Sequence, residues 1–465
     1  MSNDSSAELV LFVERMRAEG LPEPLIREFS RQYGLYREGA TGKLPWADVA
    51  VPGPTDVIAY AEVDQAARRA RGAELLDQLV CVKLNGGLGT TMKLDRAKSL
   101  IEVREGQSFL ALVARQLVTL RARHGARLPL LLMNSFHTRA DSLEVMAGFR
   151  QPDGLPLDFL QHKVPRIERV TGRPATFVDV DENWTPPGHG DVYLALYLSG
   201  LLERLAALGY RWAFVSNIDN LSATVDLGVL GLLEERGLDF AMEVTDKSPA
   251  DVKGGTLVRY GGRQLMLLER SQVEVEHLAD FEDLDRFPVF NTNNLWWRID
   301  AMLQRLRGPG VCLPLIVNPK KVAGVEVVQL ETAMGAGIGE FERAAGIRVP
   351  RARFAPVKAT CDLLVLRSDA CRLDEDGAVR PARARDAALG PPVVRLDDRY
   401  YQGLSDFDAR FPHPLSLLRC TALTVEGDVT FGRDVRVEGA VTVRNLGGAP
   451  ARIPDGALLR GDVEV

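Results

Sequence analysis

In the segment LVCVKLNGGLGTTMKLDRAKSL, residues 79–100, a short apolar run leads into three glycines, and two lysines, Lys93 and Lys98, follow them. Glycine tolerates positive φ angles and lets the main chain approach a ligand closely. Backbone N–H groups between a strand and a helix bind anions, because they converge there and the helix dipole adds a favourable field. The segment therefore favours a phosphate-binding loop, to which Lys93 and Lys98 would add positive charge. A tight turn without a ligand is the alternative.

This glycine-rich loop differs from two common nucleotide-binding loops. A Walker A loop places glycine directly before Lys-Ser or Lys-Thr, whereas Ala97 precedes Lys98 here. A dinucleotide-binding fingerprint requires a third glycine at the position of Met92. If the loop binds phosphate, it does so with a different backbone pattern.

A second candidate is Asp219 in FVSNIDN, residues 214–220, just beyond an apolar strand and between Asn217 and Asn220. A lone carboxylate at such a position suits Mg²⁺, which keeps several waters and shares its ligands with substrate phosphates. The alternative is an Asx turn that only ends the strand.

Three further segments combine glycine or asparagine with other polar residues: TPPGHGDVY, DVKGGTL and FNTNNLW. The first two carry glycines where a backbone could approach a planar or polyhydroxyl ligand. The third places Asn291, Asn293 and Asn294 within four residues. Their amide donors and acceptors suit sugar hydroxyls. Together the segments predict a site for a polar, phosphorylated ligand.

Lys358, in RFAPVKATCDLLVL, stands between a proline and an apolar run that we interpret as a strand. A lysine held at this edge can counter the charge that develops on phosphate oxygens during group transfer. The alternative is a lysine whose ammonium group simply reaches solvent from a strand end.

Composition excludes several classes of protein. With 465 residues and a net charge of −6, the chain lacks the basic surface of a sequence-independent nucleic-acid binder. Its five scattered cysteines show no zinc spacing, and we interpret them as free thiols. The N-terminus does not resemble a signal peptide, and no apolar run is long enough to span a membrane. We expect a cytoplasmic enzyme that does not contact membranes.

The elements that must position these residues fall into three predicted domains: a helical arm (1–75), a catalytic domain (76–390) and a C-terminal domain (391–465). Apolar residues at helical spacing define the arm. The catalytic domain alternates β-like runs, DLLVLRS among them, with helical segments at 108–123 and 190–207. This alternation predicts an α/β sheet covered on both faces, with ligands at its carboxyl edge.

The C-terminal domain repeats a pair of apolar residues every six positions, as in Leu423/Val425 and Val429/Phe431. Such hexads are typical of a left-handed parallel β-helix, in which each short strand stacks on the next coil. An antiparallel sandwich is the alternative.

Taken in order, the motifs LNGGLGT, KSL, LLMNSF, QHKVPRI, PPGHGD, FVSNIDN, DVKGGTL, FNTNNLW, QLETAMGA and PRARFAPVK, followed by the hexads, resemble the eukaryotic-type UTP–glucose-1-phosphate uridylyltransferase (UDP-glucose pyrophosphorylase) family. The resemblance covers the chain from about residue 75 to its end. It implies a mixed, mostly parallel, Rossmann-like (GT-A-like) nucleotidyltransferase sheet. It also implies that the glycine-rich loop holds UTP.

The resemblance carries roles onto individual residues. Lys98 and Lys358 are expected to be catalytic lysines that meet the phosphates, and Asp219 the Mg²⁺ ligand. The expected nucleotide-binding positions are Leu84, Asn85, Gly86, Gly87, Met133, Gln161, Gly188 and His189. The expected sugar-binding positions are Asn217, Gly255, Glu269, Asn291 and Asn293. Many relatives have glycine where Lys93 stands, so Lys93 either faces solvent or adds a phosphate contact.

The implied reaction is Mg²⁺-dependent in-line attack of glucose 1-phosphate on the α-phosphorus of UTP, giving UDP-glucose and pyrophosphate. Three alternatives stay open: the same chemistry on galactose 1-phosphate or N-acetylglucosamine 1-phosphate, a nucleotide-binding homologue without activity, and a β-helix acyltransferase. Charged residues between the hexads leave no continuous apolar outer face, so we expect a monomer or a weak homo-oligomer formed through the C-terminal domain.

Overall fold

Every residue of strand β3 (Leu79–Asn85) is buried, because the strand lies inside a sheet that is covered on both faces. The computed structural model describes residues 4–248, 251–262 and 264–465. The central sheet has eight strands in the order β2-β18-β12-β15-β11-β3-β6-β7. Apart from β3, its strands are β2 (Val57–Ala59), β6 (Leu130–Asn134), β7 (Asp158–Leu160), β11 (Trp212–Asn217), β12 (Phe240–Asp246), β15 (Val289–Arg298) and β18 (Ala344–Arg348).

Strand β15 runs antiparallel to both of its neighbours, β11 and β12, whereas the other adjacent pairs of this sheet are parallel. The predicted mixed, mostly parallel sheet is therefore confirmed. Successive side chains of β3 point to opposite faces, as strand geometry requires. Leu79 and Cys81 join one core, and Val80 and Val82 join the other.

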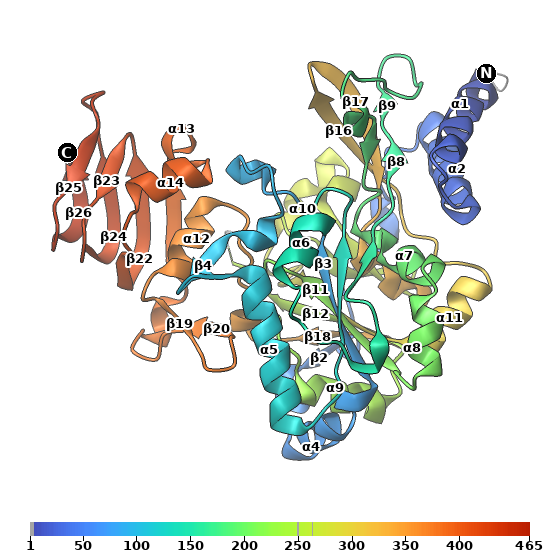
Figure 1. Cartoon of the computed structure of the whole chain (residues 1–465), viewed down its shortest axis with the longest axis horizontal. Helices are drawn as coiled ribbons and strands as arrows, with labels where there is room; N and C mark the ends of the chain where they lie inside the picture. The colour runs from blue at the N-terminus through green and yellow to red at the C-terminus, as the bar shows by residue number, and fades with distance from the viewer. Residues whose placement is uncertain (1–3, 249–250, 263) are drawn as a thin grey trace.

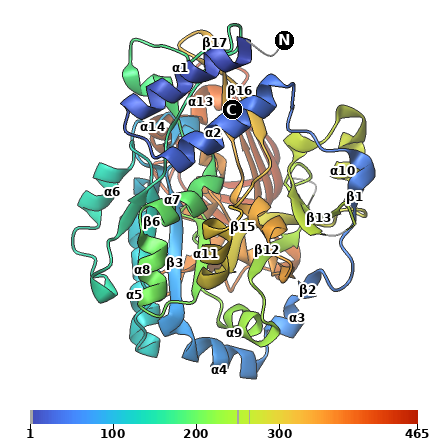
Figure 2. The ribbon, with the colours of Figure 1, turned by 90° about the vertical axis from the view of Figure 1, so that its right-hand side faces the viewer.

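Helices cover both faces of the sheet (Figures 1 and 2). One core includes α5 (Phe109–His124) and α9 (Leu227–Arg236). The opposite core includes α7 (Val192–Leu198), α8 (Leu201–Ala207) and α11 (Ile299–Arg307). The predicted helix at 108–123 is α5. The one at 190–207 is split into α7 and α8 at Gly200, whose positive φ of 73° ends the first helix.

The interpretation of DLLVLRS as a strand is wrong, because its first six residues belong to helix α12 (Thr360–Arg367) and Ser368 follows the helix end. A short apolar run such as LLVL fits a buried strand and a buried helix equally well. The deciding residue is Asp362, whose carboxylate accepts hydrogen bonds from the backbone N–H groups of Lys358 and Ala359 at 2.7 and 2.9 Å. Lys358 therefore precedes the first turn of a helix.

The N-terminal helices α1 (Asp4–Ala18) and α2 (Glu23–Arg37) pack through Phe12, Phe29 and Tyr33. The same cluster includes Trp184 and Val328, so the helix pair is attached to the part of the chain predicted to be the catalytic domain. The rest of the predicted arm differs from a helical extension, since it contains β2 of the central sheet.

Two more elements follow in this part of the chain. Strand β1 (Val49–Ala50) pairs with β13 (Thr256–Tyr260), and helix α4 (Ala66–Glu74) packs against α9. Glycines allow this close helix contact: a Cβ at Gly72 would lie 1.9 Å from the Leu227 carbonyl oxygen.

The C-terminal strands stack in parallel. Strands β21 (Val393–Leu396), β22 (Ser416–Glu426), β24 (Arg436–Arg444) and β26 (Leu458–Glu464) form one sheet, and β23 (Val429–Phe431) pairs with β25 (Ala451–Ile453). In β22 and β24, Leu423 lies opposite Val441 and Val425 opposite Val443.

The apolar residues of the hexads are buried between these strands. From Ala422 to Glu426, each residue of β22 lies opposite one in β24 that is 18 residues further along the chain, which is three hexads. Parallel pairing throughout this part of the described chain contradicts the antiparallel sandwich. Within the described ranges, no helix combines the length and the apolar character needed to cross a bilayer.

Candidate functional site

Four parallel strands, β3, β6, β7 and β11, end at the same edge of the central sheet. Near this edge, Leu84 lies opposite Asn217 on one side and Met133 on the other. Gln161 directly follows β7. Because the carboxyl ends of parallel strands meet there, predicted nucleotide and sugar positions from distant parts of the sequence become neighbours.

The glycine-rich loop folds back on itself after β3. The Lys98 N–H donates to the Gly87 carbonyl at 3.3 Å, and the Leu94 N–H donates to the Gly89 carbonyl at 3.1 Å. A Cβ at Gly89 would lie 2.5 Å from Leu94 Cδ1, so a larger residue there would displace the Leu94 side chain. This fold of the loop places Lys98 near the carboxyl edge of the central sheet.

Lys93, in the same loop, has a left-handed backbone with a φ of 54°. Its side chain is exposed and lies beside Gly403, where a Cβ would be 3.3 Å from Lys93 Cδ. Lys93 thus points toward the C-terminal domain, near the start of α14 (Leu404–Arg410).

The predicted nucleotide-binding glycines meet Gln161. A Cβ at Gly86 would lie 2.6 Å from Gln161 Oε1, and Gln161 Nε2 donates to the Gly188 carbonyl at 2.9 Å. Gly188 has a φ of 82° and packs on the backbone of Thr332, where a Cβ would be 2.3 Å from the carbonyl oxygen. These contacts bring two glycine turns and one amide together at the edge.

His189 follows Gly188 and accepts a hydrogen bond at Nδ1 from the backbone N–H of Met334, at 2.9 Å. Burial lowers the pKa of His189 to about 4, so the imidazole is neutral at physiological pH. With Nδ1 used as an acceptor, the ring proton is on Nε2, and His189 offers a neutral N–H donor.

Two other predicted nucleotide positions have side chains inside the protein. Asn85 donates from Nδ2 to Asn134 Oδ1 at 2.7 Å and to Ser142 Oγ at 2.8 Å. Met133 is buried in the core beside Leu84. The Asn85 amide thus links the end of β6 to helix α6 (Arg139–Val145).

Lys98 and Asp219 form an ion pair, with Lys98 Nζ 2.5 Å from Asp219 Oδ2. The other carboxylate oxygen, Asp219 Oδ1, is buried and has no hydrogen-bond partner. An unpartnered buried carboxylate oxygen beside an anion-binding loop fits a hard cation such as Mg²⁺. No cluster of three or more His, Cys, Asp or Glu side chains suited to a metal occurs in the part of the chain that the structure describes. Phosphate oxygens and water would therefore have to supply the remaining ligands.

The segment that carries Lys358 lies against Asp219, because the Val357 N–H donates to the Asp219 carbonyl at 3.2 Å. Lys358 also lies close to Glu269. Burial raises the pKa of Glu269, and the charge of Lys358 partly opposes this shift. Lys358 is thus situated between the predicted metal ligand and one of the predicted sugar positions.

The predicted sugar positions also meet. The Asn291 N–H donates to the Gly255 carbonyl at 2.8 Å, and a Cβ at Gly255 would lie 2.7 Å from the Glu269 carboxylate. Asn293 sits in an irregular stretch of β15 with a φ of 58°, and its side chain accepts from Asn291 Nδ2 at 2.7 Å. This irregularity turns the amides out of the regular strand pattern.

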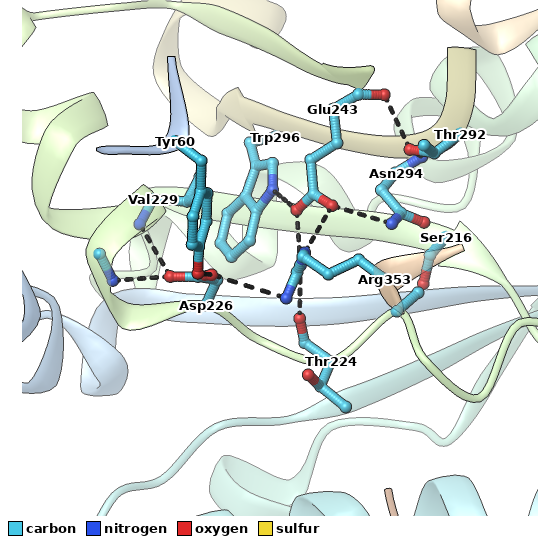
Figure 3. Close-up of polar contacts among 12 residues, drawn as sticks. Tyr60, Ser216, Thr224, Asp226, Val229, Glu243, Thr292, Asn294, Trp296 and Arg353 are labelled. Carbon is cyan, nitrogen blue, oxygen red and sulfur yellow. Dashed lines mark hydrogen bonds and ion pairs between the residues drawn. The ribbon is translucent and has the colours of Figure 1, made fainter. Parts of the chain in front are cut away.

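A buried polar network behind the site, not predicted from the sequence, links Tyr60, Asp226, Glu243, Asn294, Trp296 and Arg353 (Figure 3). Arg353 forks onto Glu243, with Nη2–Oε1 and Nε–Oε2 distances of 2.7 and 3.0 Å. Glu243 also accepts from Asn294 and Trp296, each at 2.9 Å. Tyr60 donates to Asp226, which lies 3.6 Å from Arg353. In the sequence, Arg353 is one of the two arginines of PRARFAPVK, and nothing nearby in the chain indicates its partner.

A second missed pair is His162 and Asp191. The carboxylate of Asp191 accepts from the backbone N–H of His162 at 2.7 Å and lies 2.8 Å from its Nδ1. Burial disfavours the imidazolium form, but the charge and hydrogen bond of Asp191 outweigh it and raise the pKa of His162. These two residues join the QHK and GHGD motifs next to Gln161 and Gly188.

Known proteins are similar to this chain over most of its length. Residues 26–438 match the family model described as UTP–glucose-1-phosphate uridylyltransferase. The uridylyltransferase of Solanum tuberosum is 41% identical over 436 residues, covering 93% of this chain and 90% of its own length. That of Saccharomyces cerevisiae is 39% identical over 440 residues, covering 93% and 86%.

Solved structures match over nearly the whole length. The Trypanosoma brucei UDP-glucose phosphorylase has a TM-score of 0.90 at 36% identity, covering 99% of this chain and 100% of its own. A Leishmania major UDP-glucose pyrophosphorylase variant in complex with UDP-glucose has a TM-score of 0.89 at 37% identity, covering 99% of both chains.

Proposed function

This chain belongs to the UTP–glucose-1-phosphate uridylyltransferase family, and we infer that it converts UTP and glucose 1-phosphate into UDP-glucose and pyrophosphate. One observation carries the assignment of the reaction to this site. Lys98, Asp219 and the Lys358 segment are in contact at the carboxyl edge of the sheet, where Lys98 shares its loop with Gly86 of the Gly86–Gln161–Gly188 group, and Lys358 is close to Glu269 of the Gly255–Glu269–Asn291 group.

We propose that the first group of residues holds the nucleotide and the second the sugar, so that the reacting phosphates meet beside the lysines. An oxygen of glucose 1-phosphate attacks the α-phosphorus of UTP in line. The bond from this phosphorus to the bridging oxygen of the β-phosphate breaks, and pyrophosphate leaves with the electron pair. The nucleophile is already an anion, so no general base is needed, and the residues act by positioning and by stabilising charge.

Each basic residue has a separate part in this proposal. Lys98 comes from the glycine-rich loop and Lys358 from the segment beside Asp219, so the two ammonium groups approach the phosphates from different elements. Both would offset negative charge on the α-phosphoryl oxygens and the leaving pyrophosphate. Lys93 points toward Gly403 and has no proposed contact with phosphate.

We propose Mg²⁺ as the cofactor, with Asp219 as its protein ligand. The unpartnered Asp219 Oδ1 supports this assignment. When bound, Mg²⁺ would supply a positive charge and a template for the phosphates. The ion pair with Lys98 keeps the Asp219 carboxylate oriented toward the loop.

The neutral donors of the nucleotide group favour an uncharged base and ribose. His189 offers Nε2–H without a positive charge, and Gln161 is held by Gly188. On the sugar side, Asn291 and Asn293 hold each other, while Glu269 can accept hydrogen bonds from sugar hydroxyls. Glucose 1-phosphate is the proposed sugar substrate, and galactose 1-phosphate and N-acetylglucosamine 1-phosphate are the competitors to test.

We also propose that residues 391–465 form a left-handed parallel β-helix, supported by the parallel strand pairing and by the 18-residue spacing between Ala422–Glu426 of β22 and their partners in β24. The protein is proposed to work in the cytoplasm, supported by five free cysteines. Its contacts are small molecules, with no nucleic-acid or membrane partner. A monomer or weak homo-oligomer is expected, and a stable octamer in light scattering would contradict this.

The decisive assay mixes the purified protein with UTP, glucose 1-phosphate and Mg²⁺ and measures UDP-glucose and pyrophosphate. We expect the two products in equal amounts and no turnover when Mg²⁺ is chelated. Folded protein that releases no pyrophosphate would instead support a binding protein without activity. Faster turnover of another sugar 1-phosphate would overturn the glucose assignment.

A further inference from the structure

The Lys358 side chain is exposed, and within the described residues it forms no hydrogen bond or ion pair of its own. An unpaired lysine side chain samples many rotamers, so its average position depends on the backbone that carries it. That backbone is the stretch from residue 353 to residue 359. Its hydrogen bonds therefore decide where the ammonium group can reach.

Asn220 holds this stretch with both ends of its amide. Its Nδ2 donates to the Arg353 carbonyl at 3.2 Å, and its Oδ1 accepts from the Ala355 N–H at 3.1 Å. The side chain is 1% exposed, so no water competes for these two bonds. Asn220 directly follows Asp219, which accepts from the Val357 N–H at 3.2 Å. Two adjacent residues thus tie the metal-ligand turn to the Lys358 segment.

The start of the segment has a second anchor inside the core. The Arg353 guanidinium forks onto the buried Glu243 and also donates to the Thr224 carbonyl at 2.9 Å (Figure 3). Glu243 lies on β12, and its other donors, Asn294 and Trp296, lie on β15. Because these are neighbouring strands of the central sheet, Arg353 fixes the segment to a rigid element.

We propose that Asn220 and the Arg353–Glu243 ion pair are positioning residues that hold Lys358 beside the Lys98–Asp219 pair. The side-chain polar atoms of Asn220 and Arg353 form hydrogen bonds with other protein groups. These residues therefore act on the reaction only through the position of Lys358. The inference rests on the proposed role of Lys358 in phosphoryl stabilisation. It assigns a positioning role to the side chain of Asn220, the second asparagine of SNIDN, in addition to the bond that the Asp219 carbonyl accepts from Val357.

A double-mutant cycle tests the proposal with Asn220→Ala, Lys358→Ala and the double variant. Misplacing a reacting group slightly can cost up to about 10²-fold in rate, so Asn220→Ala should lower kcat by roughly 10- to 100-fold with a smaller change in KM. In the Lys358→Ala background, the same substitution should change kcat by less than about threefold, because residues that act through one another are not additive.

Hydrogen–deuterium exchange gives a readout that does not depend on turnover. The amides of Ala355 and Val357 should exchange faster in Asn220→Ala than in the parent protein, while β3 stays protected. The matched control is Asn445→Ala in the C-terminal domain, which also removes amide bonds to backbone carbonyls, those of Asp428 and Ala449. The control should leave kcat and the exchange of residues 353–359 unchanged.

The outcomes separate this inference from the proposed function. If Lys358→Ala keeps a near-normal kcat, the proposed role of the lysine fails, and the positioning inference fails with it. If Lys358→Ala is slow but Asn220→Ala slows both backgrounds equally, Lys358 keeps its role and the positioning inference alone is overturned. Unchanged kcat in Asn220→Ala would also overturn it.

Discussion

Replacing Glu243 by glutamine should destabilise the protein strongly, although the two side chains have nearly the same shape. Glu243 is fully buried and accepts four hydrogen bonds, two from Arg353 and one each from Asn294 and Trp296. All four partners are donors. Glutamine has one carboxamide oxygen, so its NH₂ group must face two of these donors without an acceptor between them.

The magnitude follows from these contacts. Each buried donor left without an acceptor costs about 1–3 kcal/mol, and removing one partner of a buried ion pair typically costs about 3–5 kcal/mol. Arg353 would keep only Asp226, at 3.6 Å, as a carboxylate neighbour in the structure. We therefore expect Glu243→Gln to lower the free energy of unfolding by about 3–5 kcal/mol. For a chain of this length, about 1 kcal/mol corresponds to roughly one degree in Tm, so calorimetry should show a fall of about 3–5 °C.

Two controls separate the buried ion pair from a general charge effect. Glu23→Gln removes the partner of Arg17 at 2.7 Å, but both side chains are at least half exposed, so we expect a change within about 0.5 kcal/mol. Combining Glu243→Leu with Arg353→Met replaces both charges by apolar groups and should recover stability relative to either single variant. A Tm of Glu243→Gln within one degree of the parent, or a double variant no better than the singles, would refute this reasoning.

Three other predictions concern the site. Lys358→Ala should lower kcat by roughly 10²- to 10³-fold with little change in Tm, whereas Lys93→Ala should stay near the parent value; a raised KM at normal kcat would make Lys358 a ground-state binding residue. Asp219→Asn should raise the Mg²⁺ concentration needed for half-maximal rate as well as slow turnover, and an unchanged Mg²⁺ titration would remove it as a ligand. Burial lowers the pKa of His189 to about 4 in the folded protein, whereas the unfolded pKa is about 6.5. The stabilising contribution of the neutral imidazole is therefore fully present above about pH 6.5 and is lost as the pH falls toward 4. It should reach about 3 kcal/mol, and Tm measured against pH should fall less steeply for His189→Gln than for the parent.

The order of short motifs along the chain was enough to predict the family, the α/β class and the general chemistry. At Gly86, Gly188 and Gly255, a Cβ atom would clash with a neighbouring group. Few residues can replace glycine at such positions, so the glycines themselves indicate the site in the sequence. The hexads could also be recognised from the sequence, because a fixed repeat of apolar residues is a local property of the chain, and the structure buries these residues.

Other features depended on contacts between distant parts of the chain. The apolar run after Asp362 could be a strand or a helix, and the capping bonds from that carboxylate to backbone N–H groups decided for a helix. Strand β2 was hidden in the predicted helical arm because three residues carry too little periodicity to be recognised, and β18 provides its place in the sheet. The sequence left two directions open for Lys93, and in the structure its side chain lies beside Gly403.

The sequence by itself determined which chemical groups are present, because residue type and local spacing are properties of the chain. The tertiary structure alone decided which of them meet. Glu243 and Arg353 are separated by 110 positions, and Asn220 and Ala355 by 135, yet each pair is in hydrogen-bond contact. Such pairings arise when the sheet and its connections fold together and buried polar groups must find partners, a requirement that no short segment of sequence contains.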